Sequence, residues 1–332
     1  MASFAETGPS APVVESVRVD MVTPRARASL TIRMIIAIIV AVIMLIPVIW
    51  LTMTAFKSRP DAVAAPPKVF FTPSLDGLVA LLTTRNLVPP AELARLQADP
   101  GKLSLFQRVA LDRGMTIIGP SPYVGRLRNS VVIALTSTFF SVLLGLLAAY
   151  AFSRYNIPGK SDWLFFILST RMLPPVVVTI PIFIFYSRVG LRDTHLGMIL
   201  LYTAFNLSFS VWLLKGFIDE IPKEYEEAAL VDGYSRMRAF LKIVLPQAMT
   251  GVAATAVFCL IFAWNEYAFA VMLTQERART APPSIVTLQG TGGIEWGAIA
   301  AGSLGFLIPV VIVTFALRKY LLRGVTFGAI RQ

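Results

Sequence analysis

Cysteine and histidine are nearly absent from this chain of 332 residues, which has one of each, Cys259 and His195. A single cysteine cannot form an internal disulfide, and this pair alone cannot build a Cys/His zinc site. Charged residues are also scarce, at 15% of the chain, whereas soluble domains carry roughly 25%. Since 56% of the residues are hydrophobic, the composition excludes an ordinary soluble globular protein.

The chain also has no Gly-x-x-x-x-Gly-Lys-Ser/Thr phosphate-binding loop. The nearest stretch, Gly119 to Gly125, contains no lysine, so ATP is not expected to bind through that motif. Lysine and arginine exceed aspartate and glutamate by 30 to 19, giving a formal net charge of +11. In a chain this apolar, such an excess is typical of membrane topology and contact with anionic lipid. We therefore expect membrane lipid, and no nucleic acid, among its partners.

Six apolar stretches are long enough to cross a bilayer, which takes about 20 residues in a helix. Each is predicted to be a helix because other backbone structures leave polar groups unpaired in lipid. The stretches are Ile32–Phe56, Asn129–Phe152, Trp163–Tyr186, Leu196–Leu214, Gly251–Thr274 and Trp296–Leu317. The first is too long for a signal peptide, whose apolar region has roughly 7–15 residues. The sequence therefore predicts an all-α membrane protein with six transmembrane helices.

The remaining segments divide the chain further. Residues 1–31 are predicted to be a disordered leader, 57–128 a long loop and 318–332 a tail, and the core 129–317 contains a polar connector at 215–250. Lysine and arginine gather in the leader, in that connector and in the tail, rather than in the short loops on the other side. By the positive-inside rule, both termini and the connector are expected in the cytoplasm and 57–128 outside it.

The connector carries the most informative pattern in the chain. Glu227-Ala228-Ala229 is followed by Gly233 and, after nine further residues, by Ile243-x-Leu245-Pro246. The pattern predicts a short helix over Tyr225–Val231, a break at Gly233, and a second helix over Arg236–Leu245 that stops at Pro246. A helix–turn–helix held at a membrane surface is suited to docking on a soluble partner.

This spacing resembles the coupling loop of the membrane subunits of ATP-binding-cassette importers. Five further stretches extend the resemblance to the maltose-type carbohydrate importers, and specifically to their smaller permease subunit. They are Asn129-Ser130, Ala149–Tyr155 with Pro158-Gly159, Gly190-Leu191-x-Asp193-Thr194-x-Leu196-Gly197, Trp264–Tyr267, and Arg318-Lys319-Tyr320 with Gly324, Thr326, Gly328 and Ala329. The resemblance covers roughly residues 30–332 except 83–120, which is interpreted as an insertion.

The resemblance implies the type I importer permease fold in a bacterial cytoplasmic membrane. It also implies a second homologous permease, two cytoplasmic ATPase subunits and an extracytoplasmic sugar-binding protein as partners. The chain itself is then not an enzyme and has no cofactor, because ATP is bound and hydrolysed by the ATPase chains. The loop 275–295 lies where the family meets its binding protein, although an ordinary connecting loop fits the sequence equally well.

Within the connector, the resemblance gives each motif residue a role. Glu227 is expected to contact a basic residue in a cleft of the ATPase, with Ala228 and Ala229 small enough for close approach. Gly233 is expected to form the turn if the backbone needs a positive φ there. Ile243, Leu245 and Pro246 are expected to fasten the second short helix to the membrane domain. A solvated helix face is the plain alternative for Glu227.

Polar residues within the spans are candidates for the translocation path, since an ionisable group at the bilayer centre costs at least about 2.5 kcal/mol. The candidates are Trp264, Asn265, Glu266 and Tyr267 in the fifth span, Asn206 in the fourth and Arg171 in the third. Together they offer the hydrogen-bonding groups and aromatic faces that sugars need. Two alternatives stay open: Glu266 and Asn206 can instead join helices, and Arg171 can pair with Glu266 or extend to the cytoplasmic surface.

The sequence thus predicts one half of the path of an ATP-driven importer for an oligosaccharide, polyol or related sugar compound. An importer for another solute, such as glycerol phosphate esters, would share the same loop. A secondary transporter is a further alternative, but it would need internal inverted repeats, and no repeat is visible in the sequence.

Overall fold

The computed structural model describes residues 24–83, 120–290 and 293–326, with isolated positions between 91 and 108. Most of the predicted leader, most of the 83–120 insertion and the end of the 318–332 tail lie outside the described residues. The chain divides into two compact units, Met1–Trp50 and Leu51–Gln332. In the first unit, most of α1 (Pro24–Ala55) runs as one helix, which continues through Pro47. Its apolar residues occupy every face, as expected of a helix in lipid.

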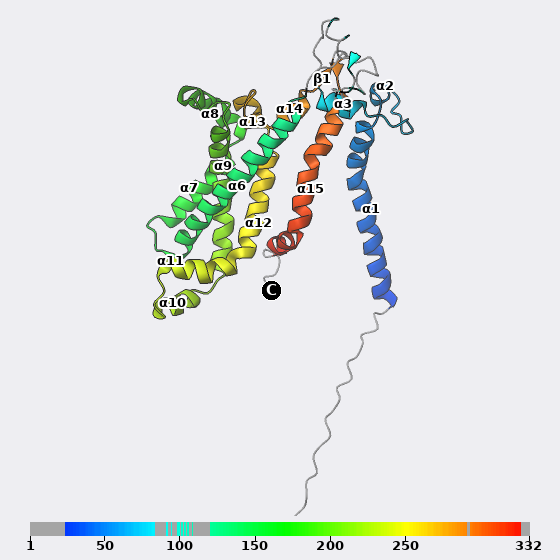
Figure 1. Ribbon diagram of the computed structural model, residues 1–332. Helices are drawn as coiled ribbons and strands as arrows, with labels where there is room; N and C mark the ends of the chain where they lie inside the picture. The colour runs from blue at the N-terminus through cyan, green and yellow to red at the C-terminus, as the bar shows by residue number, and fades with distance from the viewer. Residues whose placement is uncertain are drawn as a thin grey trace, which may run out of the picture. The chain divides into compact units, whose positions relative to one another are not determined.

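The second unit is built on three long helices that pack together. These are α6 (Tyr123–Arg154), α9 (His195–Asp219) and α12 (Leu245–Trp264). Figure 1 shows them side by side, with α15 (Trp296–Thr326) against α12 and α7 (Lys160–Met172) against α9. Small residues allow the close approach, because a Cβ atom added at Gly145 of α6 would overlap the Cβ of Ser210 of α9.

Shorter elements lie at the two ends of this bundle. At one end, the α10 end, are α10 (Glu224–Val231), α11 (Arg236–Ala239) and the π-helical turn η2 (Phe240–Val244). At the other, the α14 end, are α13 (Ala268–Leu273), α14 (Ala281–Val286) and a two-stranded antiparallel hairpin, β1 (Gln289–Gly290) with β2 (Gly293–Ile294). The chain there also forms α2 (Arg59–Ala62) and α3 (Asp76–Leu82), and α3 packs on α15.

The described helices confirm the all-α membrane architecture. Five are long and apolar enough to cross a bilayer, and a sixth span results if α7 and α8 (Pro175–Val189) are counted together. Some boundaries differ from prediction: α6 begins at Tyr123 rather than Asn129, so it extends into the segment that was expected to be a loop.

The third predicted span, Trp163–Tyr186, is divided into two helices at its prolines. α7 ends at Met172, α8 begins at Pro175, and their axes differ by 92°. Leu173 adopts an extended conformation with ψ 125° between them. The reason is the Pro174-Pro175 pair, since proline lacks the amide donor of a helix and disfavours helical backbone in the residue before it.

The predicted stop of the second short helix at Pro246 is wrong. α11, η2 and α12 follow one another from Arg236 to Trp264. In the π-helical turn the Leu245 N–H donates to the Phe240 carbonyl five residues back. Pro246 then lies at the start of α12, where a missing amide donor is tolerated. The fifth span is shifted accordingly: α12 ends at Trp264, and a break precedes α13.

Candidate functional site

The α10–α11 hairpin (residues 224–239) has the predicted helix–turn–helix form. Gly233 adopts φ +86°, and an added Cβ would meet nothing within 4 Å, so its conformation rather than lack of space favours glycine. Ser235 begins α11, and its hydroxyl accepts the Arg238 N–H at 3.3 Å.

The three residues of the Glu227-Ala228-Ala229 motif differ in exposure. Glu227 and Ala228 are exposed, whereas Ala229 is buried. Val231, at the end of α10, is an apolar side chain that is 88% exposed. No side chain of the described residues forms an ion pair with Glu227. The hairpin therefore presents an unpaired carboxylate next to a small and an apolar side chain, as a docking surface would.

The hairpin is fastened to the bundle mainly by residues outside the motif. Ile243 and Leu245 are half-buried and Pro246 is exposed. The buried residues of η2 are Phe240 and Val244, which pack in one apolar cluster with residues of α6, α9 and α12. Sequence reasoning missed them, although their spacing of four residues is that of one buried helix face.

A buried ion pair holds α10 as well. Glu226 is only 7% exposed, and its carboxylate accepts hydrogen bonds from Arg154 Nε and from the Tyr150 hydroxyl at 2.9 Å. Arg154 Nη2 also donates to the Ile221 carbonyl at 2.9 Å. Buried charges need such partners, because each loses its hydration. Tyr150 and Arg154 belong to the Ala149–Tyr155 stretch, so that motif anchors the hairpin.

Three of the predicted path residues, Arg171, Asn206 and Glu266, line one cavity of about 250 Å³. This cavity, called the polar cavity after these three side chains, lies among residues of α7, α9, α12 and α13. Its wall also includes Tyr202, Phe205, Phe262 and Phe269. It combines charged and amide groups with aromatic side chains, which is the composition expected of a site for a polyhydroxylated ligand.

Arg171 does not pair with Glu266. Its Nη1 donates to the Phe205 carbonyl at 3.2 Å, and its guanidinium lies 4.3 Å from the Phe262 ring centroid and 5.3 Å from that of Phe209. These cation–π contacts stabilise the charge within the bundle. Since no carboxylate among the described residues forms an ion pair with Arg171, its remaining N–H donors can serve a ligand.

Glu266 fills the break between α12 and α13. Its carboxylate accepts the Tyr202 hydroxyl at 2.6 Å and the backbone N–H groups of Phe269 and Ala270 at 2.8 and 3.1 Å. It therefore supplies acceptors to the otherwise unpaired first amides of α13. Glu266 thus joins helices, which is one of the two alternatives drawn from the sequence, and it also lines the cavity. Its contact with a solute stays a prediction.

The other candidates lie outside the polar cavity. Trp264 is buried and stacks on Phe306 of α15, with ring centroids 4.8 Å apart. Asn265 donates from Nδ2 to the Ile261 carbonyl of its own helix at 2.9 Å, and Tyr267 is exposed. Asn206 differs from them: it lines the cavity, and its Nδ2 donates to the Cys259 carbonyl at 3.2 Å.

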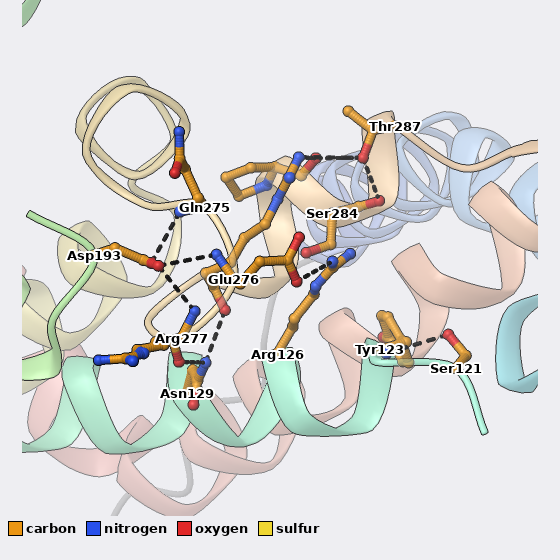
Figure 2. Close-up of polar contacts among 12 residues, drawn as sticks. Ser121, Tyr123, Arg126, Asn129, Asp193, Gln275, Glu276, Arg277, Ser284 and Thr287 are labelled. Atoms are coloured by element: carbon orange, nitrogen blue, oxygen red, sulfur yellow. Dashed lines mark hydrogen bonds and ion pairs between the residues drawn. The ribbon is translucent and has the colours of Figure 1, made fainter. Parts of the chain in front are cut away.

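At the α14 end, Asp193 holds the loop 275–281. Its carboxylate accepts four consecutive backbone N–H groups, from Gln275 at 2.9 Å and from residues 276, 277 and 278 at 3.1 Å each. Figure 2 shows the carboxylate directed at this backbone. Partial burial raises the pKa of the Asp193 carboxyl, but the four N–H donors outweigh it and lower the pKa below its ordinary value.

A second motif reaches the same loop from α6. Asn129 Nδ2 donates to the carbonyls of Arg277 and Arg279 at 2.9 and 3.0 Å, and the Ser130 hydroxyl accepts the Ala281 N–H at 2.8 Å. Figure 2 shows Asn129 beneath the loop. The Asn129-Ser130 and Asp193 motifs are more than sixty residues apart in sequence, so their convergence on one loop could not be predicted locally.

Replacing Asp193 by asparagine is expected to release this loop. Asparagine has one acceptor oxygen and no charge, so most of the four N–H groups lose their partner. Hydrogen exchange of amides 275–278 at pH 7 should accelerate by about tenfold or more, given net hydrogen-bond energies of about 1 kcal/mol each. Asp162→Asn, at an exposed carboxyl of α7, is the matched control.

The same exchange measurement has a defined pH dependence. Because the pKa of Asp193 is lowered on folding, its stabilisation is fully present above the ordinary value of 3.8 and is lost as pH falls through the lower folded value. In the wild type, the amides of the loop should therefore stay protected from exchange as the pH is lowered to about 3.8. Protection that disappeared between pH 6 and pH 5 would contradict this role.

Residues 141–327 match the family described as binding-protein-dependent transport system inner membrane component. The chain belongs to this family. It is 31% identical over 297 residues to the trehalose/maltose transport system permease protein MalG of Thermococcus litoralis, covering 89% of this chain and 94% of that one. It is 35% identical over 234 residues to the trehalose transport system permease protein SugB of Mycobacterium tuberculosis, covering 70% of this chain and 85% of that one.

The fold agrees with that membership. A crystal structure of a bacterial ABC transporter that imports the acidic polysaccharide alginate superposes with a TM-score of 0.63 at 20% identity, covering 90% of this chain and 98% of that one. The chain is thus a multi-pass membrane subunit of a transport system, with the type I importer permease fold. It is a transport component rather than an enzyme in its own right.

Proposed function

We propose that this chain is the permease subunit of an ATP-driven importer for a sugar, either an oligosaccharide, a polyol or a related compound. The α10–α11 hairpin carries the proposal, because it presents an exposed Glu227 on a helix that is firmly fastened to the bundle. A rigid, exposed lever of this kind is what a cytoplasmic ATPase needs in order to move membrane helices. The relatives that transport trehalose and maltose support the sugar assignment.

In this proposal the α10 end faces the cytoplasm, together with both termini, in a bacterial inner membrane. Two ATPase subunits engage Glu227, Ala228 and Ala229, and a second homologous permease supplies the other half of the path. A sugar-binding protein docks outside, at the α14 end. ATP is bound by the ATPase chains, and this chain requires no cofactor of its own.

The polar cavity is the proposed contribution of this chain to the path. Arg171 offers N–H donors, Asn206 offers its amide oxygen, and Phe262 and Phe269 offer aromatic surfaces. A sugar needs such groups to replace its hydrogen bonds to water when it enters a low-dielectric bundle. The cavity lies within the bundle, as a path between the two ends requires.

Uptake by cells tests the proposal. Cells lacking the gene for this chain, complemented with the wild type or with nothing, are supplied with labelled trehalose, maltose, mannitol or glycerol 3-phosphate. Uptake of at least one sugar should depend on the chain, should stop when ATP is depleted and should survive collapse of the proton gradient. Uptake of glycerol 3-phosphate alone would overturn the sugar assignment. Uptake that stops with the proton gradient while ATP persists would indicate a secondary transporter.

A further inference from the structure

α6 and α9 are packed too tightly to slide past each other. Gly145 lies against Ser210, and the Ser141 hydroxyl is shared between the Ser137 carbonyl of its own helix at 2.7 Å and the Thr203 carbonyl of α9 at 3.2 Å. Ser137, Ser141 and Ser210 are fully buried along this contact. Close-packed interfaces of small residues transmit displacement because any relative shift produces overlap. The two helices therefore form one rigid body.

One end of this pair holds α10. Arg154, in the last turn of α6, forms the buried ion pair with Glu226 and also binds the Ile221 carbonyl. Beside it, the Ser153 hydroxyl donates to Asp219 at the end of α9, at 2.5 Å. The ends of the two helices and the start of the hairpin are thus joined by buried or half-buried polar contacts. These contacts form the inner clamp, made by Ser153, Arg154, Asp219 and Glu226.

The opposite end holds the loop 275–281 in a comparable way. Asn129 and Ser130 of α6 bind it from one side, and Asp193, just before α9, binds four of its amides from another (Figure 2). His195 of α9 contacts Asn129 at 2.9 Å, so the two helices also meet here. Asn129, Ser130, Asp193 and His195 form the outer clamp.

We propose that α6 and α9 form a single transmembrane rod with a polar clamp at each end. Arg154 and Asp193 are positioning residues that attach this rod to α10 and to the loop 275–281. A displacement of the loop 275–281 then becomes a displacement of α10. The inference rests on the proposed function, in which the loop meets the binding protein and α10 meets the ATPase. It adds a route by which docking of a loaded binding protein outside would reach the ATPases inside.

The inner clamp allows a charge-swap test. The complete importer, with the ATPase and binding protein that co-purify with this chain, is reconstituted in lipid nanodiscs, and ATP hydrolysis is measured with and without sugar-loaded binding protein. Arg154→Glu should lower the stimulation by about tenfold, within the usual range of coupling between sites. Adding Glu226→Arg should restore at least half of it. Glu220→Arg, an exposed charge reversal at the same end, should change nothing.

The outer clamp provides the second arm. Asp193→Ala should also lower the stimulation by about tenfold while the unstimulated hydrolysis stays unchanged, because α10 and its anchor are intact. The rod proposal would be wrong if ATP hydrolysis were stimulated normally in either Arg154→Glu or Asp193→Ala complexes of normal subunit composition. A wild-type complex without any stimulation would instead mean that the proposed function is wrong.

Spin labels test the inner clamp independently of any partner. Cys259 is the one cysteine, so a Cys259→Ser chain can be labelled selectively at cysteines introduced elsewhere. The two label positions are exposed Asn156, just after α6, and Val231 of α10. The wild-type background should give one narrow distance distribution. Arg154→Glu should broaden it, and the swap with Glu226→Arg should narrow it again. An unchanged distribution in Arg154→Glu would overturn the clamp, whatever the ATPases do.

Discussion

Replacing Glu227 by arginine is expected to abolish transport while leaving the chain folded. Glu227 is exposed and has no ion-pair partner among the described residues, so the free energy of unfolding should change by less than about 0.5 kcal/mol. At the proposed interface, however, the change brings a cation against a basic cleft of the ATPase. Like charges in contact across an interface cost several kcal/mol, which corresponds to a loss of roughly a hundredfold or more in association.

Two measurements separate these effects. Thermal unfolding of the purified chain should match the wild type, whereas co-purification of the ATPase and sugar uptake should both be lost. Glu224→Arg is the matched control, since it makes the same charge change at an exposed position of the same helix but outside the motif. Normal uptake by Glu227→Arg would contradict the role of this residue and leave the plain solvated helix face as its explanation.

Replacing the neighbouring Glu226 by alanine should, in contrast, lower the stability of the folded chain. Glu226 is buried against Arg154 and Tyr150, so Glu226→Ala leaves an uncompensated charge inside the protein. Breaking a buried pair in this way costs about 3–5 kcal/mol. Substitutions of two adjacent glutamates therefore have different effects. Replacing Glu227 impairs assembly with the ATPase, whereas replacing Glu226 impairs folding of the α10 end. A normal unfolding temperature for Glu226→Ala would contradict this assignment.

Replacing Glu266 by alanine is expected to destabilise the bundle and to stop uptake. The Tyr202 hydroxyl and the amides of Phe269 and Ala270, three buried residues, would lose their acceptor. Each buried unsatisfied group costs about 1–3 kcal/mol, so the free energy of unfolding should fall by several kcal/mol. Glu266→Gln keeps one acceptor oxygen, and its loss of stability should be clearly smaller.

The pair of variants also shows whether the carboxylate meets the solute. If its role is only to cap α13, uptake by Glu266→Gln should follow its stability. A stable Glu266→Gln that transports nothing would place the charge in contact with the solute. Asn265→Ala is the control, because that exposed side chain binds only its own helix. An Asn265→Ala chain as unstable as Glu266→Ala would contradict the capping role.

Local patterns in the sequence were sufficient for the membrane architecture and the hairpin. Long apolar stretches must form helices in lipid, and Gly233 between two helical patterns marks a turn. They were misleading at Pro246, which starts a helix rather than ending one. Pro174-Pro175 breaks its span, and the axes of the two helices differ by 92°. The effect of a proline depends on whether the preceding turn can adapt its hydrogen bonds, as η2 does.

The tertiary structure decided how the motifs combine. Glu226 and Glu227 look equivalent in the chain, but only the position of Arg154 on a distant helix makes one an anchor and the other a free surface charge. Similarly, Arg171, Asn206 and Glu266 share one cavity, while Trp264 and Asn265 point elsewhere. Hydrophobicity and turn preference act over a few neighbouring residues and can be predicted from them. Ion pairs and cavities form between helices far apart in the chain, so they exist only once those helices have packed.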